Sequence, residues 1–282
     1  MKFGLDRIGV WSEARQFAVD GDRSIAYAKA TNDPVPAHLD GTYAPPVFAV
    51  VPIWQSIMDA LGGVTPPEAL PHVVHGEQDM WFTRPLRPGE TVTTRGVTTG
   101  VHAKSSGTTV SAKLETRDAN GDLVNEQWNV SFFRGVIADE SSGEAAPSHH
   151  VDVDGAPAAQ VRAQVDEDQT FRYADASGDR MPIHLDDEFA RNVGLPGIIV
   201  HGLCTMAFTS WAVLTEFGGA DPTRLARLAV RFSQPVLPGQ VITTSLWDAG
   251  TDSGDQVVAF STTNPEGNLV VKDGLALIRP SA

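Results

Sequence analysis

Asp179 and His184 are the residues of this sequence best suited to transfer a proton. They stand five positions apart in the segment Ser177-Gly178-Asp179-Arg-Met-Pro182-Ile-His184. The Ser-Gly step permits a tight turn and the proline stiffens the stretch that follows, so a carboxylate and an imidazole can face one point. Such a pair can hold a water molecule and move its protons, because histidine titrates near neutral pH. Taken alone, the same spacing also fits an aspartate that caps a turn and a histidine that fills a polar gap.

A downstream apolar segment offers a group that could polarise a carbonyl. Gly202 follows His201 at the start of a stretch whose large apolar residues recur at helical spacing. The first N–H groups of a helix are unpaired, and the helix dipole favours negative charge there. We therefore expect the Gly202 N–H to stabilise developing negative charge on an oxygen. Cys204 lies on the same helix face as His201, but a lone cysteine is more usually a small buried hydrophobe than a nucleophile.

An internal repeat organises the elements that must position these residues. Residues 19–40 and 165–186 match at a constant offset of 146, with eleven of 22 positions identical, and residues 81–94 and 231–244 match at an offset of 150. Each half therefore has the same order: a Tyr-containing segment, an Asp…His loop, an apolar helix and several strands. This order predicts a duplicated α+β domain. Joining the two sheets edge to edge would remove two exposed edges.

The repeat divides the chain into two units and a connection. Residues 1–137 form the predicted N-terminal unit, and residues 160–282 form the C-terminal unit that carries the complete motif. Residues 138–159 are rich in Ala, Ser, Gly, Pro and Asp, and are predicted to be a linker. His149 and His150 lie in this linker without cysteines or patterned acidic ligands, so we expect no metal site there.

The first unit keeps Asp33 and His38 but loses the residues around them. Thr-Asn stands where the second unit has Ser-Gly, and Val51-Pro52 stands where it has His-Gly. Proline has no N–H to donate, so the first site lacks the group that would hold an oxyanion. We predict that it is degenerate, with Asp33 and His38 left as remnants of the duplication in structural hydrogen bonds.

Composition excludes several classes of function. The chain has 21 Lys and Arg against 35 Asp and Glu, a formal net charge of −14, which disfavours nucleic acid and anionic membranes as partners. Its single cysteine cannot form an intrachain disulfide and fits a reducing compartment. The N-terminus lacks the apolar core of a signal peptide, and no apolar run is long enough to cross a bilayer. We expect a cytoplasmic protein without a nucleotide cofactor or a metal, since the usual motifs for both are missing.

The combined motif, [FY]-x-x-x-S-G-D-x-x-P-x-H followed further on by H-G at the start of an apolar helix, resembles a known family. It is similar to the MaoC-like (R)-specific enoyl-CoA hydratases, which include (3R)-hydroxyacyl-thioester dehydratases. The resemblance covers nearly the whole chain, and it implies an α+β tandem (double) hotdog, with each antiparallel sheet wrapped around a central helix. It also implies that the N-terminal unit helps to house the acyl chain.

The same resemblance implies an activity and assigns roles to residues. The activity is reversible syn hydration of trans-2-enoyl thioesters of coenzyme A or acyl carrier protein to (3R)-3-hydroxyacyl thioesters, in fatty-acyl metabolism and without a cofactor. Asp179 and His184 match the catalytic pair, one removing a proton and the other delivering one, and Gly202 matches the glycine whose N–H holds the thioester carbonyl. Met181 departs from the asparagine often found in the family, so an orienting hydrogen bond is missing or replaced. Supporting positions are Ser177, Gly178 and His201.

Two other functions remain open at this point. A hotdog thioesterase would use the same fold for hydrolysis, and a non-catalytic acyl-thioester-binding protein would use it for binding alone. Association of two such chains into a homodimer is also left open.

Overall fold

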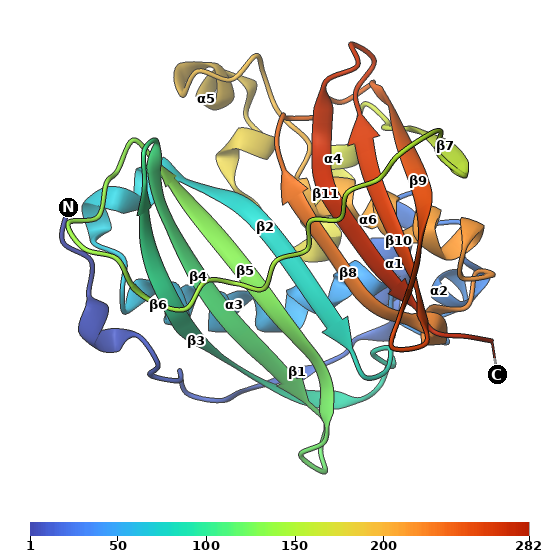
Figure 1. The fold of residues 1–282 in the computed structure, drawn as a ribbon, viewed down its shortest axis with the longest axis horizontal. Helices are drawn as coiled ribbons and strands as arrows, with labels where there is room; N and C mark the ends of the chain where they lie inside the picture. Colours follow the sequence, from blue (N-terminus) through green and yellow to red (C-terminus); the bar gives the residue numbers. More distant parts are fainter. Residues whose placement is uncertain (282) are drawn as a thin grey trace.

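The computed structural model describes residues 1–281 as one antiparallel sheet with helices on its concave face (Figure 1). The strands follow the order β1-β3-β4-β5-β2-β8-β11-β10-β9-β7, and the short β6 pairs with β3. The N-terminal elements are β1 (Arg15–Ala18), α1 (Gly21–Ala30), α2 (Pro36–Leu39), α3 (Val50–Gly62), β2 (Val73–Phe82), β3 (Thr91–Lys104), β4 (Gly107–Arg117), β5 (Leu123–Arg134) and β6 (Ser142–Gly143). The C-terminal elements are β7 (Ala159–Gln164), α4 (Gln169–Ser177), α5 (Asp187–Asn192), α6 (Gly202–Glu216), β8 (Leu225–Phe232), β9 (Val241–Asp252), β10 (Asp255–Thr263) and β11 (Leu269–Ile278).

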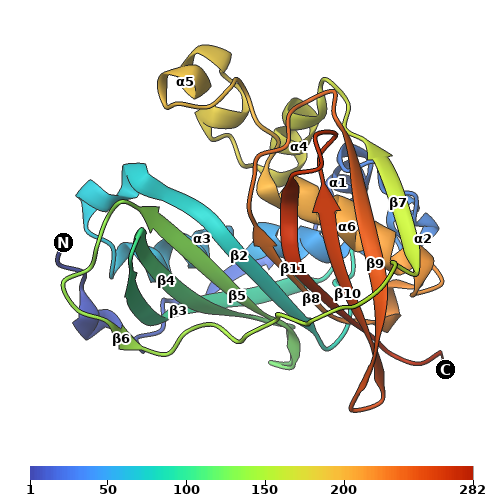
Figure 2. The same cartoon turned by 45° about the horizontal axis from the view of Figure 1, so that its top comes forward.

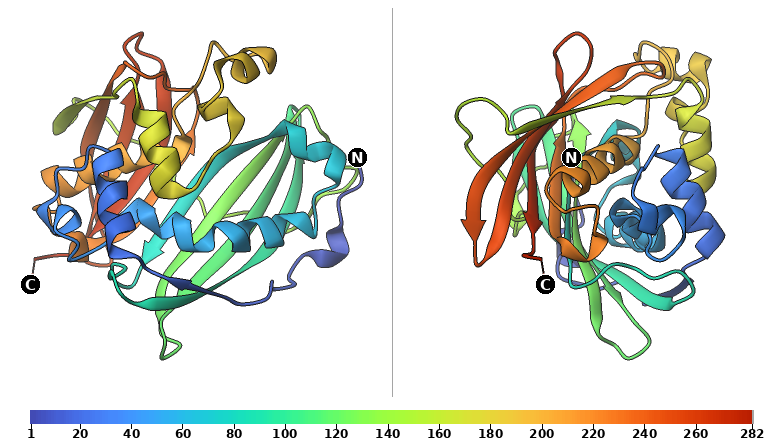
Figure 3. Two further views of the ribbon diagram at one scale, coloured as in Figure 1. Left: turned by 180° about the vertical axis from the view of Figure 1, so that it is seen from behind. Right: turned by 90° about the vertical axis from the view of Figure 1, so that its right-hand side faces the viewer.

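Each half of the sheet curves around one helix, α3 in the first half and α6 in the second (Figure 3). The halves meet where β2 pairs with β8, in a register that runs from Glu77 opposite Arg231 to Trp81 opposite Arg227. The predicted α+β tandem hotdog is therefore confirmed, including the edge-to-edge joining of its two sheets.

Local sequence patterns explain the strands that were predicted. Val110, Ala112 and Leu114 alternate along β4, and all three side chains are fully buried. The turn between β4 and β5 closes with the Gly121 N–H donating to the Asp118 carbonyl at 3.0 Å. Gly121 has a φ of 86°, a left-handed conformation that glycine adopts without strain.

The helix pair α1 and α4 packs at the boundary between the units, on the side of the central helices that faces away from the sheet (Figure 3). Tyr27 of α1 and Tyr173 of α4 are equivalent residues of the repeat. Their buried hydroxyl groups lie 3.0 Å apart, so one donates a hydrogen bond to the other. The duplicated halves thus contact each other through the same residue of each.

The segment predicted as a linker is packed against the outer face of the sheet. It contains β6 and crosses the strands of both halves before β7 begins (Figures 1 and 2). The His149 Nδ1 lies 2.6 Å from the Asp273 carbonyl, and the Ser148 carbonyl accepts a hydrogen bond from Arg227 at 3.3 Å. The His150 Nδ1 lies 2.9 Å from the Asp273 Oδ1, so both histidines contact the same residue of β11. Arg227 also pairs with the buried Asp79 at 2.7 Å.

Within residues 1–281, no helix is both long enough and apolar enough to cross a membrane.

Candidate active site

The loop that follows α4 holds Asp179 in a fixed orientation. Helix α4 ends at Ser177, and Gly178 caps it with a φ of 86°. The Asp179 N–H donates to the Ser177 Oγ at 3.1 Å, and the Asp179 Oδ1 accepts a hydrogen bond from the Met181 N–H at 3.1 Å. This backbone donor orients the Asp179 carboxylate whichever residue type stands at position 181.

His184 is oriented by a backbone carbonyl. It ends the short 3₁₀ helix Pro182–His184, and its Nδ1 lies 2.8 Å from the carbonyl oxygen of Ile199. A carbonyl can only accept, so Nδ1 carries the proton and Nε2 keeps a free lone pair. Burial lowers the pKa of His184, although the Ile199 carbonyl and the Asp179 charge oppose this. His184 is therefore a neutral imidazole near pH 7, which is the form of a general base.

His201 supports both members of the pair. Its ring stacks on that of His184 with centroids 3.8 Å apart and planes 25° apart. Its Nε2–H donates to the backbone oxygen of Asp179 at 3.0 Å, and Tyr173 packs on the ring at 4.7 Å. Burial is the main cause and the neighbouring His184 the second cause of a lowered pKa of His201, which falls to about 3. This ring therefore stays neutral.

The donor atoms of Asp179, His184 and His201 all lie within 4.8 Å of one another, which raises the question of a metal ion. The Nδ1 of His184 and the Nε2 of His201 are already used by backbone carbonyls. Because the two rings are stacked with planes only 25° apart, their remaining lone pairs lie in separate, nearly parallel planes, which disfavours tetrahedral coordination of one ion. The arrangement suits a water molecule held between Asp179 and His184 better than a metal ion.

Gly202 is the first residue of α6, and His201 is the N-cap. Its N–H belongs to the group of helix donors that have no partner inside the helix, at the positive end of the dipole. A Cβ built on Gly202 would lie 3.3 Å from two carbons of the Phe232 ring, so the packing of this ring favours glycine. Gly202 directly follows His201, whose ring contacts both the His184 ring and the Asp179 backbone.

A hollow next to Asp179 is lined by both units. Its walls from the C-terminal unit include Asp179 and Leu203, and α3 contributes apolar side chains from the other unit, so an apolar group bound here would contact both units. The lining residues are Val50, Val51, Trp54, Tyr173, Ser177, Asp179 and Leu203.

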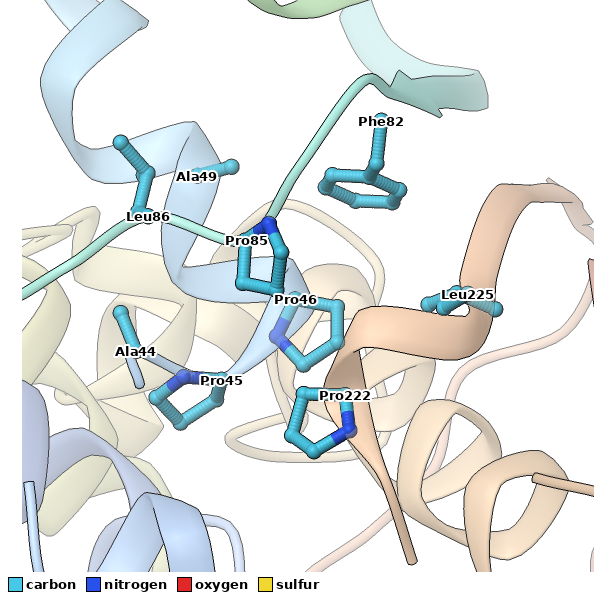
Figure 4. Close-up of a pocket in the computed structure, with 9 residues that line it drawn as sticks. All are labelled: Ala44, Pro45, Pro46, Ala49, Phe82, Pro85, Leu86, Pro222 and Leu225. Atoms are coloured by element: carbon cyan, nitrogen blue, oxygen red, sulfur yellow. The ribbon is translucent and has the colours of Figure 1, made fainter. Parts of the chain in front are cut away.

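A second hollow, near the start of α3, is lined by alanine, proline, phenylalanine and leucine (Figure 4). It contains no side chain that could transfer a proton. The lining residues are Ala44, Pro45, Pro46, Ala49, Phe82, Pro85, Leu86, Pro222 and Leu225.

In the first unit, the equivalent residues Asp33 and His38 are hydrogen-bonded directly to each other. The His38 Nδ1 lies 2.8 Å from the Asp33 Oδ2, and the Asp33 Oδ1 accepts a hydrogen bond from the Val35 N–H at 2.9 Å. Both side chains are buried, and the His38 Nε2 has no partner in the described part of the chain. A pair that is bonded directly leaves no place for water between its members, whereas His184 is bonded to Ile199 and not to Asp179.

Cys204 cannot act as a thiolate in this environment. It is completely buried in α6, and burial raises the pKa of its thiol well above the usual range. Because only the thiolate is a strong nucleophile, this residue belongs to the core.

Sequence reasoning missed two groups that shape the site. The Ile199 carbonyl sets the tautomer of His184, and a backbone group gives no signal in residue types. Arg23, from α1 of the other unit, contacts the end of α4. A comparison of the two repeats could have drawn attention to Arg23, because the equivalent position of the second unit holds the uncharged Gln169.

Comparisons with known proteins cover both halves of the chain. The family model "MaoC like domain" matches residues 150–268, and the model "FAS1-like, dehydratase domain region" matches residues 6–127. The peroxisomal multifunctional enzyme type 2 of Drosophila melanogaster is 33% identical over 231 residues, which are 77% of this chain but only 38% of that enzyme. The chain thus spans well under half of that relative.

Other relatives match along most of their length. The probable enoyl-CoA hydratase 2 of Dictyostelium discoideum is 29% identical over 86% of this chain and 82% of its own. The 3-hydroxyacyl-thioester dehydratase Y of Mycobacterium tuberculosis is 29% identical over 81% of this chain and 79% of its own. The crystal structure of a MaoC-like dehydratase from Phytophthora capsici has a TM-score of 0.85 at 27% identity, covering 99% of this chain and 98% of that one.

Proposed function

Because this chain belongs to the family of MaoC-like dehydratases, we propose that it is a hydro-lyase that reversibly adds water to trans-2-enoyl thioesters and yields (3R)-3-hydroxyacyl thioesters. The observation that carries the proposal is the neutral His184, whose free Nε2 lies beside the Asp179 carboxylate at the start of α6. An imidazole that can accept a proton and a neighbouring carboxylate match what the reaction needs.

In the proposed mechanism, the Gly202 N–H binds the thioester oxygen. This interaction strengthens as the oxygen gains negative charge, and it lowers the barrier to attack at C3. Asp179 and His184 hold one water molecule between them. As the water oxygen bonds to C3, the C2=C3 electron pair moves toward the carbonyl and forms an enolate.

The proton of the water passes to His184 and then to C2. The His184 Nε2, whose lone pair is free, accepts the proton, and the Asp179 carboxylate stabilises the imidazolium that forms. The imidazolium then protonates C2 as the enolate collapses, and this returns the site to its starting state. Oxygen and proton arrive from one side, so the addition is syn. No electron leaves the substrate, and the protein groups alone complete the cycle.

The proposed reaction leaves three further properties to be determined: the acyl carrier, the length of the acyl chain and the cellular compartment. We propose coenzyme A as the thioester carrier because several relatives are named enoyl-CoA hydratases, and acyl carrier protein is the alternative carrier. A cytoplasmic location remains a prediction, to be checked by cell fractionation. Sedimentation would show whether two chains associate into a homodimer.

The test is a hydration assay run beside a thiol-release assay, with crotonyl-, octenoyl- and longer enoyl-CoA. We expect loss of the conjugated enoyl absorbance without release of free thiol. Thiol release at a comparable rate would instead indicate a thioesterase, and binding without either reaction would indicate a non-catalytic binding protein.

A further inference from the structure

Arg23 of α1 reaches from the N-terminal unit to the end of α4 in the C-terminal unit. Its Nε donates to the Ala176 carbonyl at 2.7 Å, and its Nη2 donates to the Ser177 carbonyl at 2.6 Å. These are the last carbonyl groups of α4, which have no partner inside the helix and carry the negative end of its dipole. A guanidinium group satisfies both with one planar fork and adds a favourable charge.

This contact lies directly beneath the catalytic loop. A Cβ built on Gly178 would lie 3.0 Å from the Arg23 Nη2, and Gly178 immediately precedes Asp179. Ser177, whose carbonyl accepts a hydrogen bond from Arg23, also accepts a hydrogen bond from the Asp179 N–H through its Oγ. His201 holds the Asp179 carbonyl from the other side. The position of the Asp179 backbone thus depends on contacts from α6, from α4 and, through α4, from the other unit.

The first unit shows how the same loop is held where the site is degenerate. At the offset of 146, Ala30 and Thr31 are the equivalents of Ala176 and Ser177. The side-chain amide of Gln169, the equivalent of Arg23, donates to the Ala30 carbonyl, and the Trp211 indole N–H donates to the Thr31 carbonyl at 3.1 Å. Two neutral donors therefore do at the degenerate site what one cation does at the proposed working site.

We propose that Arg23 is a positioning residue for the active site, supplied by the unit that does not perform the chemistry. It fixes the end of α4, so that the Asp179 carboxylate stays at the correct distance from His184 and the water. The inference rests on the proposed hydratase activity, and it gives the first unit a catalytic purpose besides its contribution to the hollow.

The experiment compares Arg23→Ala with Gln169→Ala, the matched change at the degenerate site. Each removes hydrogen bonds between α1 and α4, so each is expected to lower the Tm. A displaced catalytic group typically costs up to about 10²-fold in rate. We therefore expect Arg23→Ala to lower kcat by about 10- to 10²-fold with a nearly unchanged KM, while Gln169→Ala leaves kcat within about twofold of the wild type.

A third variant, Arg23→Lys, keeps the charge but not the fork, and it secures the test if the alanine variant does not fold. We expect it to stay folded by circular dichroism and to lose part of kcat, because a single ammonium cannot hold both carbonyls. The proposal is overturned if folded Arg23 variants keep the wild-type kcat, if Gln169→Ala loses as much kcat as Arg23→Ala, or if only KM rises. Wild-type protein without hydratase activity would contradict the proposed function itself, so the two failures are distinguishable.

Discussion

Replacing Gly202 by proline removes the one N–H group that the mechanism assigns to the thioester oxygen. Proline is tolerated in the first turn of a helix, and Gly202 is the first residue of α6. The structure shows that Gly202→Ala is the correct control. Both variants add a Cβ that meets the Phe232 ring at 3.3 Å, and such overpacking typically costs about 1–3 kcal/mol of stability. Only the proline variant also loses the N–H.

The expected magnitude follows from this comparison. Loss of one oxyanion-hole donor typically lowers kcat by about 10²–10³-fold, so the kcat of Gly202→Pro should fall below that of Gly202→Ala by this factor. The assay is kcat for crotonyl-CoA at saturating substrate, with circular dichroism to confirm folding. Repeating both changes in a Phe232→Leu background relieves the ring contact and should leave the ratio intact. Equal kcat values in the two variants would refute the reasoning, because the carbonyl would then be held elsewhere.

Two other outcomes follow from the site and its histidines. Asp179→Asn should lower kcat by about 10²-fold or more, whereas Asp33→Asn should change it little; the reverse result in the same assay would place the working site in the first unit. Burial lowers the pKa of His75 to about 4 and that of His201 to about 3, so the unfolded chain binds these protons first as the pH falls below about 6.5. The free energy of unfolding, measured by urea titration, should therefore decrease between pH 6.5 and 4.5 by about 2 kcal/mol for each of these histidines. The His201→Phe variant should show a shallower decrease, and an unchanged slope would contradict the burial argument.

The site could be predicted as a set of residue types but not as a geometry. Residue types and spacing identified Asp179 and His184, and the start of an apolar helix after His201 identified Gly202. Asp33 and His38 have the same types and spacing, yet they form a closed hydrogen bond. The difference lies in what each imidazole meets in the folded chain, an aspartate in one unit and a backbone carbonyl in the other, and no local pattern encodes that.

The fold could be predicted from the sequence more fully than the contacts within it. Alternation in β4 and the turn at Gly121 report local preferences, and the matched halves required two similar units. The packing of residues 138–159 could not be predicted, because their composition resembles that of a flexible linker. Ser148 and His149 are held by Arg227 and Asp273 of the other half, so their order depends on the completed sheet.

Hydration of crotonyl-CoA in deuterated water, followed by determination of the configuration at C2 and C3, tests the central claim most directly. The account holds that Asp179 and His184 act from one side of the substrate with water as the source of both the hydroxyl and the proton. It predicts a (3R)-3-hydroxyacyl product with one deuterium at C2 on the face that received the oxygen. Anti addition, a 3S product or the absence of hydration would contradict it.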